Sequence, residues 1–290
     1  MTLACGVAWR QLLRDVARRL DEEGSDNAEQ EARWLVEWVG GFDAAAWHLG
    51  QDRLAPEGAA ASLWEMVDRR VAGEPLQYVL GCWGFRGLAL RVDRRVLIPR
   101  PETELLVDAA LSECERLEAK RAADLGTGSG AIAASLATER EGLEVWATDV
   151  SSAALAVARL NVAQLGDAAG RVRLAEGSWF QALPDDLAGG VDVVVGNPPY
   201  VATAELLDLP FEVREWEPPV ALLAGNRGLD HISAIVAEAP RWLRRPGALL
   251  LELAPNQVRE ARRLAHRAGF TAVSVLLDLA GRDRFLLARL

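Results

Sequence analysis

The sequence predicts an α/β protein with a Rossmann-like, mainly parallel sheet, preceded by a small helical domain. Three observations indicate this fold. From Arg121 onward, short apolar runs alternate with segments of helical periodicity, which is the order of βαβ units. A glycine-rich segment, Gly126–Gly130, joins the first expected strand of this region to a helix. The run Val193–Val195 predicts a strand that is covered on both faces.

The composition is that of an acidic globular protein. The chain of 290 residues has room for two domains or one large one. It carries 32 Lys and Arg against 42 Asp and Glu, which gives a formal net charge of −10. Generic binding to DNA or RNA depends on neutralising phosphates, so we expect no direct nucleic acid partner.

The cysteines argue against a disulfide framework and favour a reducing cytoplasm. They are odd in number, lie far apart and include no C-x-x-C pair, and the histidines share no ligand spacing, so we also expect no metal. The three cysteines are Cys5, Cys82 and Cys114. The N-terminus lacks a basic segment followed by an apolar run, and no apolar run approaches the ~18 residues that span a bilayer. We therefore expect neither a signal peptide nor a membrane partner.

Residues 1–75 are expected to form a helical domain. Apolar residues recur at helical spacing in its first helix. These residues are Val7, Leu12, Leu13, Val16 and Leu20. Asp26 and Glu29 have the spacing of a capping box and predict a second helix that ends at Gly40. By analogy with other enzymes, a helical domain in this place serves substrate recognition.

Residues 76–100 are expected to form a β-hairpin that links the two domains. Glycines interrupt short apolar pieces there, and Leu88–Val92 alternates between apolar and other residues. The second domain then opens with a helix. Pro101 suits the first helical position, and Glu102 and Glu104 suit the positive end of the helix dipole. A plain helix start and a place beside the active site both remain open for these acids.

The segment Gly126–Gly130 predicts a nucleotide site. It follows a strand expected at Ala122–Leu125, and its glycines let a ligand approach the backbone and the free N–H groups of the next helix. The following strand ends at Asp149, 19 residues after Gly130, where such folds hold a ribose diol. The segment lacks the spacing of dinucleotide sites and the lysine of a P-loop. An adenosine-bearing ligand is therefore favoured, and glycines with a purely structural role are the alternative.

The segment Asn197-Pro198-Pro199-Tyr200 follows the expected strand Val191–Val195. Its prolines fix φ and remove two backbone donors, and each residue before a proline is pushed out of the helical region. We call it the shelf, because it predicts a rigid turn at the carboxyl end of a strand, where open α/β sheets bind ligands. The oxygens of the shelf and the ring of Tyr200 suit a planar NH2 group, as in an amide or an aromatic amine. An ordinary strand-to-loop turn is the alternative.

The rest of the second domain, residues 101–290, continues the alternation. Trp179 follows the third strand and either flanks an adenine ring or packs in the core. Val201–Val220 is a long excursion, which is either a lid over the substrate or a solvated acidic loop. A tight turn at Gly281 predicts that the last two strands are antiparallel. Further strands are expected at 143–148, 171–175, 248–252, 271–277 and 284–288, and helices at 131–136, 152–165, 229–242 and 256–268.

Together these stretches resemble the PrmC/HemK family of protein-glutamine N5-methyltransferases, which methylate peptide chain release factors. The resemblance covers nearly the whole chain. The matching segments are Gly73–Tyr78, Val96–Glu104, Asp124–Gly130, Asn197–Tyr200 and Glu217–Pro218. The second of these is specific to the family, whereas the glycine segment is shared by S-adenosylmethionine-dependent methyltransferases and the shelf by DNA adenine methyltransferases. Arg227 departs from the family pattern, which commonly has an acid there, and so does Ala254, where the family has glycine.

The resemblance implies a class I methyltransferase fold with a seven-stranded mixed sheet. It also implies S-adenosylmethionine as the methyl donor, S-adenosylhomocysteine as the product, and the glutamine of the Gly-Gly-Gln motif of class 1 release factors as the acceptor in translation termination. The implied cofactor residues are Gly126, Thr127, Gly128, Ser129, Gly130, Asp149, Trp179 and Asn197. The implied acceptor-binding residues are Asn197, Pro198, Pro199 and Tyr200, of which Asn197, Pro198 and Tyr200 carry catalysis.

Three other functions remain open at this point. An N6-adenine DNA methyltransferase would use the same shelf, but the net charge of −10 counts against it. A glutamine of a ribosomal protein would be another acceptor for the same chemistry. A module that binds a nucleotide and a protein without catalysis is the third, and the intact shelf counts against it.

Overall fold

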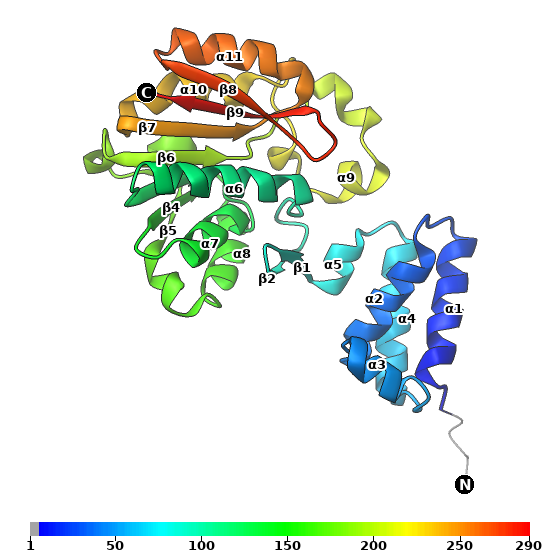
Figure 1. Ribbon diagram of the computed structural model, residues 1–290. Coiled ribbons are helices and arrows are strands. Elements are labelled where there is room, and N and C mark those ends of the chain that lie inside the picture. Colours follow the sequence, from blue (N-terminus) through cyan, green and yellow to red (C-terminus); the bar gives the residue numbers. More distant parts are fainter. Residues whose placement is uncertain (1–5) are drawn as a thin grey trace. The chain divides into compact units, whose positions relative to one another are not determined.

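The computed structural model describes residues 6–290, which form two compact units (Figure 1). The first unit ends at Gly81 and the second comprises Cys82–Leu290, so the division lies a few residues after the boundary expected at residue 75. Cys5 lies outside the described residues.

The first unit consists of helices around a core of its own. They are α1 (Trp9–Glu22), α2 (Ala28–Gly40), α3 (Ala44–Gly50), α4 (Glu57–Val71) and α5 (Leu76–Leu80). The predicted stripe is buried at Leu12, Val16 and Leu20, whereas Val7 precedes the helix and is exposed. The predicted capping box is wrong, because the residue that caps α2 is Asn27, whose side chain makes no capping hydrogen bond. Gly41 terminates α2 with a left-handed φ of 64°.

The second unit begins with a hairpin that is shorter than predicted. Strands β1 (Cys82–Phe85) and β2 (Leu88–Arg91) pair antiparallel. The prediction was wrong for Leu76–Leu80, which is helical, and residues 92–100 form no strand. Helix α6 (Pro101–Arg116) has Pro101 as its first residue, as predicted.

A seven-stranded sheet forms the body of the second unit, in the order β5-β4-β3-β6-β7-β9-β8. The first five strands of this order run parallel, and β9 is antiparallel to both of its neighbours. The strands are β3 (Arg121–Leu125), β4 (Glu144–Asp149), β5 (Val172–Glu176), β6 (Val191–Gly196), β7 (Leu243–Glu252), β8 (Ala272–Leu277) and β9 (Asp283–Arg289). The α/β fold and the antiparallel last pair are both confirmed.

Helices cover both faces of this sheet (Figure 1). The α-helices after α6 are α7 (Ala131–Glu139), α8 (Ser152–Val162), α9 (Phe211–Trp216), α10 (Asp230–Trp242) and α11 (Val258–Arg267). The short 3-10 helices are η1 (Gly166–Arg171), η2 (Trp179–Ala182), η3 (Asp185–Leu187), η4 (Thr203–Asp208), η5 (Pro219–Ala221) and η6 (Pro255–Gln257). The excursion Val201–Val220 is thus built of short helices rather than of loop alone.

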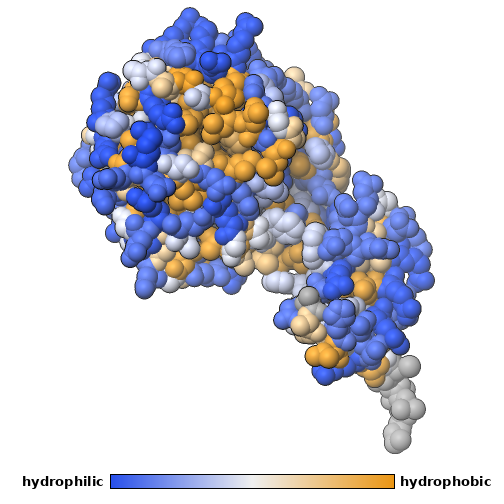
Figure 2. Space-filling model, viewed as in Figure 1, coloured by the Kyte–Doolittle hydropathy of each residue, from blue (hydrophilic) through white to orange (hydrophobic). Residues whose placement is uncertain are grey.

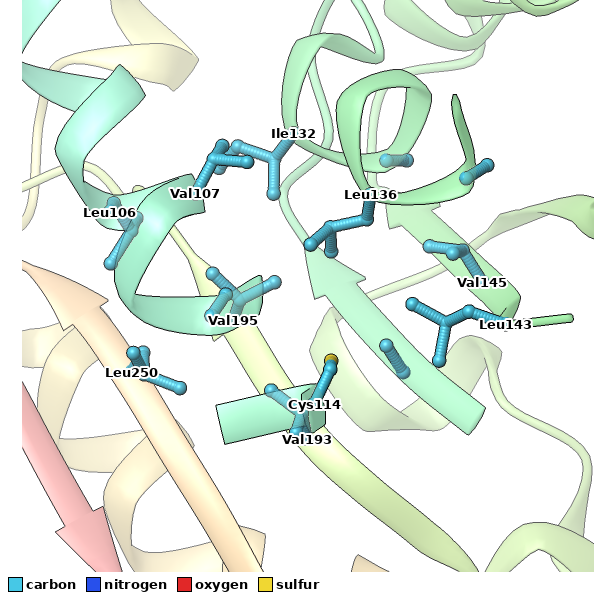
Figure 3. Close-up of a cluster of buried hydrophobic side chains, with 14 of the residues drawn as sticks. Leu106, Val107, Cys114, Ile132, Leu136, Leu143, Val145, Val193, Val195 and Leu250 are labelled. Atoms are coloured by element: carbon cyan, nitrogen blue, oxygen red, sulfur yellow. The ribbon is translucent and has the colours of Figure 1, made fainter. Parts of the chain in front are cut away.

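The valine run of β6 is buried from both sides. Val193 and Val195 pack in the cluster that contains α6 and α7, which Figure 3 shows from one side. Val194 points into the opposite cluster, which contains α10 and α11. All three side chains are 0% exposed, as the absence of polar residues in this run predicts. The shelf therefore follows directly from a strand that is packed on both faces.

The surface is mostly hydrophilic on the side shown in Figure 2, and apolar residues gather over the end of the sheet that contains β8 and β9. Within residues 6–290, every helix is too short or too polar to cross a bilayer.

Candidate active site

A cavity of about 340 Å³ lies at the carboxyl edge of the parallel strands in the second unit. Its volume is within the range of small-molecule sites, ~300–1,000 Å³. Of the predicted site residues, Gly126–Ser129, Asp149, Trp179, Asn197 and Pro199 line it. Gly130, Pro198 and Tyr200 do not. The segments that follow β3, β4, β5 and β6 therefore meet at one place, which the sheet order explains because carboxyl ends of parallel strands share an edge.

The glycine segment forms one wall of the cavity, and Trp179 packs against it. Gly126, Gly128 and Gly130 have φ values of 73°, 56° and 83°, a region that other residues rarely adopt. A Cβ on Gly126 would lie 3.1 Å from Cζ3 of the Trp179 ring. Trp179 itself has a φ of 49°, which is unusual for a bulky residue. The backbone is thus held in the shape that brings this ring over the glycines.

Asp149 ends β4 and is tied to the backbone on both sides. Its carboxylate accepts hydrogen bonds from the N–H of Gly128 and from the N–H of Ser151, both at 2.9 Å. Burial raises the pKa of this carboxyl above its ordinary value, and the two N–H groups oppose that rise. Each carboxylate oxygen retains a lone pair, so Asp149 can still accept from the hydroxyls of a ligand.

Asp124, at the end of β3, is a component of the site that the sequence did not single out. It is 0% exposed and accepts from Thr127 Oγ1 at 2.6 Å and from the N–H of Ala133 at 3.2 Å. Its Oδ1 atom has no hydrogen-bond partner among residues 6–290. Burial raises the pKa of Asp124 to about 7, and the charge of Asp149 adds to the rise. The Asp124 carboxyl thus supports the glycine segment through its hydrogen bond with Thr127.

The shelf leaves the end of β6 through a close contact between backbones. A Cβ on Gly196 would lie 2.7 Å from the carbonyl oxygen of Leu125, so only glycine permits this approach of β6 to β3. Pro198 and Pro199 are buried. Gln257 Nε2 donates to the carbonyl of Tyr200 at 2.7 Å and so fixes the far end of the shelf. The shelf is therefore anchored at both ends.

Buried polar side chains connect Asn197 with Tyr200 behind the shelf. Asn197 Nδ2 donates to Thr103 Oγ1 at 3.4 Å, and Thr103 Oγ1 donates to Glu252 Oε2 at 2.8 Å. Arg284 Nη2 donates to Glu252 Oε1 and to Tyr200 Oη, both at 2.9 Å. The guanidinium carbon of Arg284 also lies 5.2 Å from the centre of the Tyr200 ring. The ring of Tyr200 thus packs beside Arg284 rather than facing the cavity.

An ion pair closes the side of the cavity next to α6. Arg100, which lines the cavity, pairs with Glu217, whose side chain is 1% exposed. Burial raises the pKa of Glu217, and the charge of Arg100 opposes this rise. Glu215, by contrast, pairs with Arg214 and is about half exposed. Of these two acids in the excursion, Glu217 holds a residue of the cavity wall, Arg100, and Glu215 is a surface residue.

The acids of the first turn of α6 are not in the cavity. Glu104 accepts from the N–H of Arg86 at 3.0 Å, and Glu102 lies 3.9 Å from Arg282. His231 does line the cavity, with its ring centre 5.2 Å from that of Trp179, and no spacing in the sequence pointed to it. Within residues 6–290, no group of three or more His, Cys, Asp and Glu side chains could hold a metal ion.

The residues of the cavity fit an adenosyl ligand. Free backbone N–H groups at the start of α7, a carboxylate at the end of β4 and an aromatic ring beside the glycines supply the polar and stacking partners of a nucleoside. No hydrogen bond within the described residues reaches Oδ1 of Asn197, whose amide nitrogen alone is engaged. That oxygen is available to a group that donates N–H.

Two family models match the chain. The model of the PrmC N-terminal domain matches residues 11–81, and the model of the methyltransferase small domain matches residues 101–209. The chain is 44% identical to the release factor glutamine methyltransferase of Cereibacter sphaeroides over 280 residues, which cover 96% of this chain and 97% of that protein. It is 41% identical to the protein of the same name from Deinococcus radiodurans over 281 residues, which cover 97% and 98%.

Solved structures share the fold at low sequence identity. The catalytic domain of hMettl16 in complex with a hairpin of the MAT2A 3′UTR has a TM-score of 0.56 and 18% identity, with 82% of this chain and 84% of that chain covered. The N-terminal domain of human METTL16 in complex with SAH has a TM-score of 0.52 and 16% identity, with 93% and 96% covered.

Proposed function

Because this chain belongs to the family of release factor glutamine methyltransferases, we propose that it transfers a methyl group from S-adenosylmethionine to the side-chain amide nitrogen of a glutamine in a release factor. The observation that carries the proposal is the shelf, which leaves Oδ1 of Asn197 without a partner among residues 6–290 and beside a nucleoside-sized cavity. We propose the glutamine of the Gly-Gly-Gln motif of class 1 release factors as the acceptor.

The donor pocket of this proposal is the part of the cavity formed by the glycine segment, Asp149 and Trp179. Bound there, S-adenosylmethionine supplies a methyl group activated by a positively charged sulfur. The backbone N–H groups near the start of α7 and the Asp149 carboxylate orient the ligand. The Trp179 ring packs against Gly126 and supplies an apolar surface on that side.

The acceptor amide is held by oxygens of the shelf. In this proposal one amide N–H donates to Asn197 Oδ1 and the other to the carbonyl of Pro198, and Tyr200 supports the shelf from behind. Both acceptors are preorganised, because the prolines and the packed valines of β6 hold the backbone of this segment in one conformation. Holding the two hydrogens draws electron density towards the amide nitrogen and fixes its direction of attack, so catalysis is mainly positioning and electrostatics.

The direct test is intact-mass analysis after incubation of the chain with S-adenosylmethionine and a purified class 1 release factor. We expect a gain of one methyl group, mapped to the glutamine of the Gly-Gly-Gln motif, and no gain on a release factor in which this glutamine is alanine. Parallel reactions contain duplex DNA or purified ribosomal proteins. Methyl transfer to adenine, or to ribosomal proteins alone, would contradict the proposed acceptor.

We propose further that the N-terminal unit contributes to recognition of the release factor, which the match to the PrmC N-terminal domain supports. We also propose a cytoplasmic location, supported by the proposed acceptor and by the free thiols of Cys82 and Cys114.

A further inference from the structure

We propose that Thr103 and Glu252 form a directional hydrogen-bond relay that fixes the orientation of the Asn197 carboxamide, with its oxygen presented to the acceptor. Both are positioning residues, since they act through Asn197. The inference deepens the proposed function and rests on it for the identity of the acceptor. It is carried by two distances, from Glu252 Oε2 to Thr103 Oγ1 at 2.8 Å and from Thr103 Oγ1 to Asn197 Nδ2 at 3.4 Å.

Glu252, the last residue of β7, determines which groups of the relay donate and which accept. This side chain is 0% exposed, and Arg284 donates to its other oxygen at 2.9 Å. Burial raises the pKa of Glu252, and the charge of Arg284 opposes that rise. The 2.9 Å ion pair with the Arg284 guanidinium is the contact that favours an ionised carboxylate here. An ionised carboxylate can only accept hydrogen bonds. Glu252 therefore requires a donor from Thr103.

Thr103 determines which atom of Asn197 faces it, because a hydroxyl has only one proton to donate. That proton is committed to Glu252, so towards Asn197 the oxygen can offer only a lone pair. Thr103 is 5% exposed and lies in the first turn of α6, where Pro101 fixes the backbone. Its hydroxyl is therefore held in place as an acceptor.

An asparagine beside an acceptor must present its NH2 group. The two ends of the carboxamide are similar in size, so packing alone does not choose between them. With Nδ2 directed to Thr103, Oδ1 lies at the opposite end of the group, and Asn197 lines the cavity. The reverse orientation would place two oxygens together and offer NH2 to an acceptor amide that itself presents N–H groups. The relay thus selects the one orientation that can accept from the substrate.

The test compares wild type with Thr103→Val, Thr103→Ser, Asn197→Ala and the double variant that combines Thr103→Val with Asn197→Ala, using release factor methylation as the assay. We expect Thr103→Val to lower kcat by about tenfold while the KM for S-adenosylmethionine changes by less than about twofold. Thr103→Ser keeps the hydroxyl and should recover most of the loss. In the Asn197→Ala background, Thr103→Val should cost less than about twofold more, because the group through which it acts is gone.

Two controls separate this role from a structural one. Thr271→Val makes the same substitution at an exposed threonine that donates to the carbonyl of Arg289 at 3.3 Å, and it should leave kcat unchanged. Thermal melting of each variant reports on folding. Amide NMR gives a readout independent of activity: the Nδ2 protons of Asn197, assigned by their loss in Asn197→Ala, should exchange faster in Thr103→Val and at the wild-type rate in Thr103→Ser.

The relay is refuted if Thr103→Val retains full kcat, or if its loss adds in full to that of Asn197→Ala. Unchanged exchange of the Asn197 amide in Thr103→Val would refute it as well. A wild-type chain that methylates no glutamine would instead overturn the proposed function, and the NMR comparison would still decide whether the relay orients Asn197.

Discussion

Arg100 and Glu217 form an ion pair in which a single guanidinium nitrogen, Nη2, lies 2.8 Å from each oxygen of the carboxylate. The pair joins the residue before α6 to the residue after α9, and the Glu217 side chain is 1% exposed. Because the carboxylate is withdrawn from water, solvent screens this pair far less than it screens the surface pairs. The excursion that contains α9 is thereby attached to the wall of the cavity.

Removing Glu217 should therefore loosen the excursion. We expect Glu217→Ala to leave Arg100 without its partner and to lower kcat/KM for the release factor by about tenfold, equal to about 1.4 kcal/mol. Hydrogen exchange of the amides of η4 and α9 should accelerate. Glu215→Ala, which breaks an exposed pair with Arg214, is the control and should change neither quantity. Equal exchange rates in both variants would show that the pair does not hold the excursion.

Asn197→Ala tests the shelf directly. Loss of one preorganised polar partner of the reacting group should lower kcat by ~10²-fold or more, while the fold is retained. Asn197→Asp keeps two acceptor oxygens but adds a charge, and we expect intermediate activity. Asn256→Ala, at an exposed position, is the control. Methyl transfer by Asn197→Ala at the wild-type rate would rule out the role proposed for this side chain.

Gly126→Ala should weaken binding of S-adenosylhomocysteine. The new Cβ would lie 3.1 Å from the Trp179 ring, and a φ of 73° strains any residue other than glycine, at a cost of ~1–2 kcal/mol. We expect affinity, measured by calorimetry, to fall by about tenfold as the ring moves. Gly142→Ala has a similar φ of 75° with nothing within 4 Å, so it should lose stability and keep affinity. Equal affinities of the two variants would contradict this account.

Asp124 should give the protein a pH-dependent stability with a definite sign. Its pKa is raised from 3.8 to about 7 in the folded state, so between these values the folded protein binds more protons than the unfolded one. Stability must therefore fall as pH rises from about 4 to about 7. In Asp124→Asn this contribution is absent. We expect the difference in unfolding free energy between wild type and variant, from urea titrations, to change by about 3 kcal/mol over that range. A constant difference would mean that the carboxyl titrates normally.

The fold was predictable wherever one segment carries its own signal. The valines of β6 predict a strand buried on both faces, and both faces are covered. The helix expected at 152–165 is α8, and Ser151 caps it by accepting from the N–H of Ala154 at 3.1 Å. The helix at Leu76–Leu80 was missed because the glycines that flank it suggested turns between strands. Residues 92–100 include the apolar run Val96–Ile98 but have no neighbour in the β-hairpin with which to pair.

The candidate site was predictable only where its residues are close in the sequence. The glycine segment, Asp149 and the shelf each follow a strand, and sheet order brings them together. Thr103 and Glu252 are separated by 149 positions, and neither has a local pattern that announces its partner. Asp124 was assigned to its strand as an ordinary member, because only the structure shows that its carboxyl is buried under Thr127. Long-range polar contacts of this kind arise from the packing of distant segments, and they produce no periodic pattern in the sequence.

The contact between Gly196 and Leu125 has a consequence for how such an enzyme can change during evolution. It lies between β3, which with β4 carries the glycines and Asp149, and β6, which carries the shelf, while β7 and β9 contribute Glu252 and Arg284 beyond it. The glycine segment and Asp149 thus lie on one side of the β3–β6 contact, and the shelf, Glu252 and Arg284 lie on the other. Substitutions in β7 and β9 can therefore alter the surroundings of the shelf without changing the glycine segment or Asp149, whereas Asn197 and His231 line the same cavity as those residues.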